Sequence, residues 1–160
     1  MAWRMLGRVF VAEGRNAWFR GPAIVAIPRP MGGAVWRIHV SPRDGANRSS
    51  VCWFEMDLRR PGHVLAVSAA PLLQPGPPGA FDEAGAMGAC IVEAGGEERL
   101  YYQGWSLPPG RPFHTAIGLA VRRIGDHDRP FERVSDRPIL EGAAGGPPAR
   151  TPAPGRAGSG

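Results

Sequence analysis

The chain repeats itself, and this repeat restricts the fold more than any other feature. Val67–Leu73 recurs as Val134–Leu140, an offset of 67 residues, with Val at the start, Pro in the fifth place and two large aliphatic residues at the end. Three earlier apolar runs pair across the two copies in the same order: 23–27 with 89–92, 35–40 with 99–104, and 51–56 with 117–121. Each copy thus holds four short runs rich in Val, Ile, Trp, Tyr and Phe, which is strand chemistry.

The arrangement of these runs predicts an all-β fold. Turn-forming clusters of Gly, Pro, Asp and Asn separate them, for example at 30–33 and 45–47. Four strands in each unit with a fixed repeat are typical of a β-propeller blade, so we expect a partial β-propeller with two four-stranded antiparallel blades, at about 22–73 and 86–140. A single β-sandwich with an accidental repeat is the alternative.

The composition changes abruptly after Leu140. Half of residues 141–160 are Gly or Pro and none is a large apolar residue, so this Gly/Pro/Ala-rich tail is expected to be disordered. Closed propellers use roughly four to eight blades. We therefore expect the chain to be a truncated or frameshifted part of a longer protein, and its uncovered blade faces to favour self-association.

Charge and cysteine content argue against several classes of protein. The net charge is +5, but all 19 basic residues are arginines scattered through strands and turns, so we expect no nucleic-acid partner. Cys52 and Cys90 lie in apolar stretches and are expected to be buried free thiols. No segment has the pattern of a signal peptide or the length of a membrane span, so a cytoplasmic protein without membrane contact is expected.

Several motifs, in order, resemble a family of bacterial predicted glycosyl hydrolases that are related in fold to the five-bladed propellers of glycoside hydrolase families 32 and 43. The matching stretches are 41–44, 81–85, 100–105, 116–120, 131–135 and 138–140. The resemblance implies a chain about twice as long, acting on glycosidic bonds of a polysaccharide. Three places depart from the family pattern: Gly21-Pro22-Ala23 and Ala26-Ile27-Pro28 stand where the family tends to have Ser-His-Ala and Pro-Thr-Pro, and Gly88 stands where it often has Pro.

Such enzymes use carboxylates around the propeller opening, and Asp44 is the first candidate catalytic residue. The resemblance implies that the Arg43-Asp44 pair lies near the reacting centre, with Asp44 holding sugar hydroxyls. Arg43 is expected to orient the Asp44 carboxylate by a charge-assisted hydrogen bond. A polar hairpin turn at Arg43-Asp44-Gly45 explains the same residues equally well.

Asp82, where the second unit begins, is the second catalytic candidate, and a solvated turn is its alternative interpretation. We expect the carboxylates of Asp44 and Asp82 to face one opening within about 10 Å, with neither buried between the sheets. Trp105 is a candidate for stacking on a sugar ring, although a tryptophan in a β-rich protein is more often part of the core. Arg20 and Arg43 are candidate substrate-binding residues, including for a phosphate.

No cofactor or metal site is predicted. Asp126-His127-Asp128 contains metal-type ligands but is expected to be a turn, and no Gly-rich phosphate loop or paired-cysteine motif occurs. The predicted function is therefore that of a glycoside hydrolase-like propeller fragment with a carbohydrate partner. The chain alone is expected to be inactive, since the general acid would come from a later blade. Two alternatives remain open: a non-catalytic carbohydrate-binding or polysaccharide-assembly protein, and a glycoside phosphorylase-like enzyme.

Overall fold

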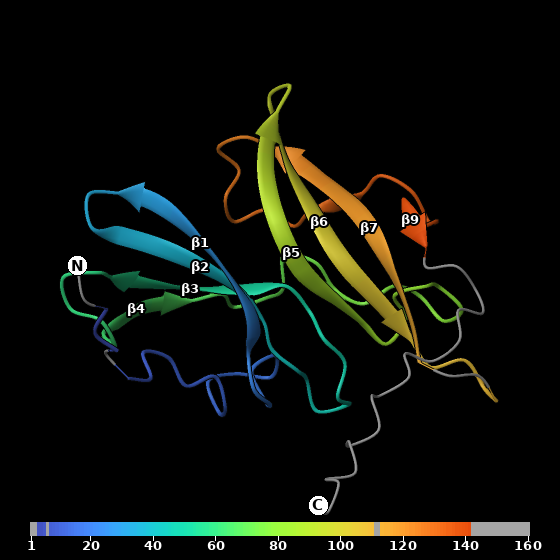
Figure 1. Cartoon of the computed structure of the whole chain (residues 1–160), viewed down its shortest axis with the longest axis horizontal. Helices are drawn as coiled ribbons and strands as arrows, with labels where there is room; N and C mark the ends of the chain where they lie inside the picture. Colours follow the sequence, from blue (N-terminus) through green and yellow to red (C-terminus); the bar gives the residue numbers. More distant parts are fainter. Residues whose placement is uncertain (1–2, 6, 111–112, 142–160) are drawn as a thin grey trace, which may run out of the picture.

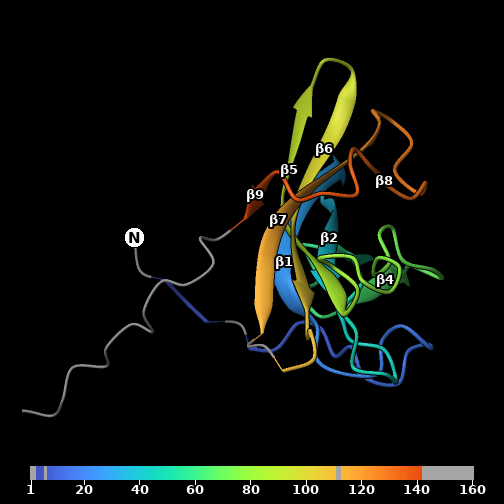
Figure 2. The same cartoon turned by 90° about the vertical axis from the view of Figure 1, so that its right-hand side faces the viewer.

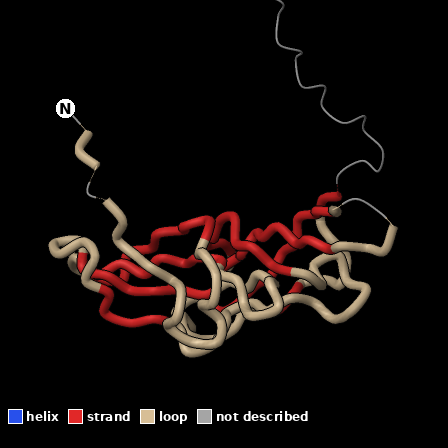
Figure 3. The backbone as a smooth tube through the Cα atoms, turned by 90° about the horizontal axis from the view of Figure 1, so that it is seen from below, coloured by secondary structure: helices blue, strands red, loops and turns tan. Residues whose placement is uncertain are grey.

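The fold consists of two antiparallel β-sheets joined in sequence (Figure 1). The computed structural model describes residues 3–5, 7–110 and 113–141. Figure 3 shows only strands and loops in this part of the chain, as the sequence predicts. Hence none of the described residues belongs to a helix long and apolar enough to cross a membrane. The predicted disordered tail lies outside the described residues, except for Glu141.

The first sheet is a four-stranded meander. Its strands are β1 (Ile24–Gly32), β2 (Val35–Ser41), β3 (Cys52–Asp57) and β4 (Val64–Val67), in that spatial order. The β1–β2 hairpin turns at Gly32 and Gly33, which both adopt a positive φ that a side chain would disfavour. The strands begin and end close to the predicted apolar runs, because alternating and β-branched residues favour strands locally.

The second sheet has five strands where four were predicted. β5 (Gly85–Ala94), β6 (Glu97–Ser106) and β7 (His114–Arg123) form long hairpins, and two short strands, β8 (Glu132–Arg133) and β9 (Leu140–Glu141), both pair with β7. The run 134–140 does not form one continuous strand. Pro138 within it has no N–H to donate, and the chain leaves β7 after β8 and returns at β9.

The internal repeat corresponds to a repeated pattern of hydrogen bonds. The amide of Leu72 donates to the carbonyl of Val51 at 2.7 Å, and the amide of Ile139 donates to the carbonyl of Ile117 at 2.7 Å. Ser68 donates to Trp53 at 2.9 Å, and Val134, which matches Val67 rather than Ser68, donates to Leu119 at 3.0 Å. The two copies therefore share the bond after the repeated proline and differ by one residue in register at the start of the fourth element.

The two sheets pack against each other through one apolar cluster. The β5–β6 hairpin projects beyond the first sheet (Figures 1 and 2), while the beginning of β5 contacts β1 and β2. The cluster between the sheets comprises Val51, Leu72, Leu73, Ala86, Leu100, Tyr102, Ala120 and Phe131. Its burial joins two segments that are distant in sequence, so the relative placement of the sheets depends on it.

The N-terminal segment covers the opposite face of the first sheet. The ring of Phe10 stacks on that of Phe54 with centroids 3.9 Å apart, and Phe19 is fully buried in the same cluster. Cys52 lies in this cluster as a buried free thiol, as predicted. The prediction that Cys90 is buried is wrong: it is free but exposed, because it pairs with Tyr101 on the face of the second sheet that points away from the inter-sheet cluster.

Candidate functional site

Four of the five predicted site residues gather where β2 and β6 end and β5 begins. The Arg43 carbonyl accepts hydrogen bonds from the amides of Arg20 at 2.9 Å and Gly21 at 3.1 Å, so the N-terminal segment adjoins the loop after β2. That loop also reaches the second sheet, because Ser49 forms a bridge with Gly85. Arg20, Arg43, Asp44 and Trp105 thus lie around one end of the two sheets.

Trp105 is held rigidly at this end. Its indole N–H donates to Ser49 Oγ at 3.4 Å, and the Arg43 guanidinium carbon lies 5.2 Å from the centre of its ring. Only 4% of Trp105 is exposed, and a side chain at Gly85 would collide with the indole. The structure therefore places the Trp105 ring beneath Arg43 rather than in solvent, and a role in stacking on sugar stays a prediction.

Phe113 is an aromatic residue of this site that the sequence interpretation did not single out. It precedes β7, its ring centroid lies 5.5 Å from that of Trp105, and 55% of the residue is exposed. A phenylalanine beside a Pro/Gly loop was the available signal, since exposed aromatic residues on loops often mark binding surfaces. Arg43, Trp105 and Phe113 together form what we call the Arg43 cluster.

Asp44 is engaged in the turn that follows β2. Its Oδ1 accepts from the amides of Ala46 and Arg48, both at 2.9 Å, and its Oδ2 accepts from the Arg48 guanidinium at 3.0 and 2.9 Å. Partial burial would raise the pKa of Asp44, but the hydrogen bonds from Arg48 and Ala46 outweigh it and lower the pKa below its ordinary value. Asn47 completes the turn with a φ of 62°.

Arg43 does not hold Asp44, contrary to expectation, because its guanidinium turns toward Trp105 while Arg48 binds the carboxylate. This geometry favours the hairpin-turn interpretation that the sequence left open. The catalytic role of Asp44 stays a prediction.

Asp82 is buried, so the expectation that its carboxylate faces an opening is wrong. Only 1% of the residue is exposed, and its Oδ2 accepts from the Tyr102 hydroxyl at 3.1 Å and from Arg133 at 2.9 and 2.7 Å. Burial, followed by the charge of Asp82, raises the pKa of Tyr102 far above its ordinary value, which keeps Tyr102 a donor. A side chain at Gly104 would overlap Phe81 and Asp82, so glycine makes room for this loop.

The contacts of Asp82 tie the loop before β5 to β8. Arg133 also donates to the carbonyl of Gln74 at 2.6 Å, closing the other end of that loop. Of the two Asp82 oxygens, Oδ1 has no hydrogen-bond partner among the described residues. This arrangement explains Asp82 as an anchor of the inter-sheet connection, and its catalytic assignment stays a prediction.

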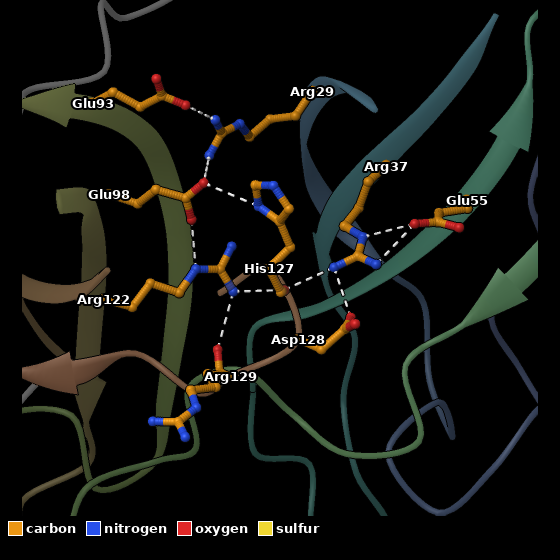
Figure 4. A network of polar contacts seen from close by, with 9 residues as sticks. All are labelled: Arg29, Arg37, Glu55, Glu93, Glu98, Arg122, His127, Asp128 and Arg129. Atoms are coloured by element: carbon orange, nitrogen blue, oxygen red, sulfur yellow. Dashed lines mark hydrogen bonds and ion pairs between the residues drawn. The ribbon is translucent and has the colours of Figure 1, made fainter. Parts of the chain in front are cut away.

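A second polar cluster lies between the sheets at the opposite strand ends (Figure 4). The Glu98 carboxylate, which is fully buried, pairs with Arg29 of β1 and with Arg122 of β7 at 2.5 Å, and lies 3.3 Å from His127 Nδ1. Arg37 pairs with Glu55 at 2.8 Å and Asp128 at 2.9 Å. Sequence interpretation missed this cluster. The available signal was that Glu98 lies on the same core-facing side of its strand as Leu100 and Tyr102, where a carboxylate is unusual.

The arginines of this inter-sheet cluster also fix the loop after β7. The His127 carbonyl accepts from Arg37 and from Arg122, each at 2.7 Å, and the Arg129 carbonyl accepts from Arg122 at 3.0 Å. Asp126-His127-Asp128 is therefore a turn that joins the sheets, both through the His127 carbonyl and through the Asp128 carboxylate on Arg37. Across residues 3–5, 7–110 and 113–141, no three His, Cys, Asp or Glu side chains are arranged to hold a metal ion.

His39 is a further buried basic residue between the sheets, beside Arg37 and Arg122. Desolvation by burial, with the positive charge of Arg122 next in importance, lowers the pKa of His39 to about 4. Neither ring nitrogen has a hydrogen bond of normal geometry to a described residue. His39 is therefore neutral near pH 7 and packs as a flat, largely apolar group.

Comparisons with known proteins find relatives but no assigned activity. No family model matches the chain. Over 140 residues, 88% of its length, it is 41% identical to the uncharacterized protein MT1551 of Mycobacterium tuberculosis strain CDC 1551 / Oshkosh, and the uncharacterized protein Rv1502 of strain ATCC 25618 / H37Rv matches to the same extent. The match covers 46% of each relative, so the chain spans about half the length of the curated relatives it matches.

Proposed function

We propose that the chain forms two neighbouring blades of a carbohydrate-active β-propeller and contributes a saccharide-binding surface at the Arg43 cluster. Each sheet is built from one continuous stretch of chain in the order of the sequence, and the described strands do not cross between sheets. An immunoglobulin-type sandwich would interleave its strands between the two sheets. The repeated hydrogen bonds and the greater length of the relatives are consistent with further blades in a complete propeller.

One observation carries the saccharide-binding part of the proposal. Residues chosen from sequence as substrate-binding, namely Arg20, Arg43 and Trp105, converge at a single end of the sheets although they come from three separate segments. In the Arg43 cluster, Arg43 lies over Trp105 and the exposed Phe113 lies beside them. Such a surface suits a sugar, because the aromatic ring packs on the sugar ring and the guanidinium donates to its polar substituents.

We propose further that the longer protein acts on glycosidic bonds of a polysaccharide, as the family resemblance implies, and that this chain alone does not. Both candidate carboxylates already have partners within the chain: Asp44 binds Arg48, and Asp82 binds Tyr102 and Arg133. A general acid or base needs an oxygen within reach of the substrate. Two alternatives remain: a non-catalytic binding protein, and a phosphorylase-like enzyme, for which Arg20 and Arg43 would bind phosphate.

The test is titration of the full chain with a panel of neutral and acidic oligosaccharides, followed by calorimetry. We expect binding that Arg43→Gln weakens at least fivefold and that the matched surface variant Arg60→Gln leaves unchanged. Reducing-sugar and phosphorolysis assays on the same samples should show no turnover. Absence of binding to every member of the panel would refute saccharide binding by this chain.

The outer face of the second sheet supports the predicted self-association. Tyr101, Ile117 and Leu119 project from it and are only partly covered. In our proposal a further blade covers this face in the longer protein, and a second copy covers it in the isolated chain. Light scattering of the purified chain should show dimers or larger species, whereas a strictly monomeric chain would contradict this part. A cytoplasmic location and the lack of a nucleic-acid partner stay predictions.

A further inference from the structure

The Arg43 guanidinium has hydrogen-bond donors without acceptors. Its Nη1 donates to the carbonyl of Asn47 at 3.0 Å and to the side-chain oxygen of Asn47 at 3.1 Å. Its Nε and Nη2 donate to none of the described residues. The guanidinium carbon lies 5.2 Å from the centre of the Trp105 ring, so the indole borders the group on one side.

Among the described residues no carboxylate pairs with Arg43, and Glu141, beside the start of β7, lies 3.2 Å from His114. Asp44, the neighbouring acid, is bound by Arg48 through two nitrogens, and neither Arg20 nor Arg43 forms an ion pair with a described residue. Elsewhere the arginines that organise the fold are paired with acids, as Arg122 is with Glu98. The local charge at the Arg43 cluster is therefore positive, and its side chains offer donors rather than acceptors.

Phe113 supplies an apolar surface beside these donors. It is more than half exposed and leans on the buried Trp105, with an angle of 34° between the rings. Because Trp105 is fixed below it, Phe113 is supported on one side and open on the other. Leu107, at the end of the same sheet, is also 60% exposed and extends the apolar surface.

We infer that the Arg43 cluster binds an acidic saccharide, with a uronic acid carboxylate accepting from Arg43 and the sugar ring lying on Phe113. This inference rests on the proposed saccharide binding and names its substrate class. A neutral sugar presents hydroxyls that need acceptors as well as donors, and the nearby acceptor, Asp44, is already occupied. A carboxylate supplies only acceptors and matches the guanidinium fork.

The test uses the full chain and uronic acid oligosaccharides of several types, such as trimers of galacturonic and mannuronic acid. Each acid is compared with its methyl ester, which has the same stereochemistry but no charge. For at least one type we expect the acid to bind five- to tenfold more tightly than its ester by calorimetry. Arg43→Gln should abolish that difference, whereas Arg60→Gln should preserve it, and Phe113→Ala should weaken acid and ester alike.

The outcomes separate this inference from the proposed function. If esters bind as well as acids and Phe113→Ala weakens both, the acidic class is overturned while saccharide binding stands. If neither form binds in any type, the inference is overturned, and the panel of neutral oligosaccharides then decides whether saccharide binding stands. If inorganic phosphate competes as well as the acid trimer and Phe113→Ala has no effect, the cluster is a simple anion site and the inference is overturned.

Discussion

Replacing Glu98 by Gln tests whether the inter-sheet cluster holds the two sheets together. Glu98 and Arg122 are almost fully buried, with exposed side-chain fractions of 0% and 3%. Glutamine keeps the shape of the side chain but leaves the Arg122 charge without its counter-charge at a place from which solvent is excluded. Breaking a buried pair in this way typically costs about 3–5 kcal/mol in the free energy of unfolding. For a chain of this size that corresponds to a fall in Tm of roughly 10 °C.

The expected pH dependence of the wild-type chain follows from the same contacts. Burial alone would raise the pKa of Glu98, but the hydrogen bond and charge of Arg122, together with Arg29, outweigh it and lower the pKa. Glu98 therefore stabilises the fold fully above the ordinary glutamate pKa of about 4.3, and that contribution is lost as the pH falls through the lower folded-state value. Burial lowers the pKa of Arg122 as well, but the guanidinium stays charged throughout this range.

The assay is urea-induced unfolding followed by far-ultraviolet circular dichroism. Glu97→Gln is the matched control, because Glu97 is the preceding residue, is 45% exposed and pairs with Arg99 only at 3.7 Å. It should cost less than about 0.5 kcal/mol. A double variant, Glu98→Gln with Arg122→Gln, should cost less than the sum of the single changes, since no uncompensated charge is buried. If Glu98→Gln costs no more than Glu97→Gln, the cluster does not hold the sheets together.

Three further changes probe other contacts. In the wild type, the lowered pKa of His39 should reduce the free energy of unfolding by about 3 kcal/mol as the pH falls from 6.5 to about 4. His39→Leu should remove this loss, whereas His63→Leu, at an exposed position, should not. An acid unfolding midpoint that His39→Leu leaves unchanged would contradict this. Gly104→Ala should cost about 3 kcal/mol in urea unfolding because its Cβ would overlap side chains of the loop before β5, and Gly45→Ala, in open space, is the control. Asp44→Ala should lower the Tm more than Asp44→Asn, which keeps an acceptor for the turn amides, and equal effects would argue against the turn interpretation.

The sheets could be predicted from sequence because strand signals are local. Alternating and β-branched runs and the internal repeat located β2, β3, β6 and β7 to within a few residues. The fourth element of each unit was less predictable. Pro71 and Pro138, which occupy equivalent places in the repeat, interrupt the hydrogen bonding of the fourth element. Whether the chain then returns to the neighbouring strand depends on tertiary packing, of Leu72 in the first unit and of β9 in the second.

The candidate site was only partly predictable. Arg43 and Trp105 were selected from sequence and do lie together, but the partners of the two acids were not foreseen. Arg48 lies only four residues after Asp44, where an Asx turn was the available signal. Asp82 was expected to face an opening because it begins the second unit, with a solvated turn as the alternative, yet its loop folds onto the second sheet and buries the carboxylate.

The sequence by itself determined the class of the fold: an all-β chain made of two consecutive units of similar strands. Tertiary structure alone decided which charges are buried and what they pair with. The partners of Asp82 are 20 and 51 residues away, and Arg29 reaches Glu98 across 69 residues. The alternation of side chains along a strand is a property of a few neighbouring residues. The pairing of an ion depends instead on how two sheets stack, because only stacking removes the water that would otherwise solvate it.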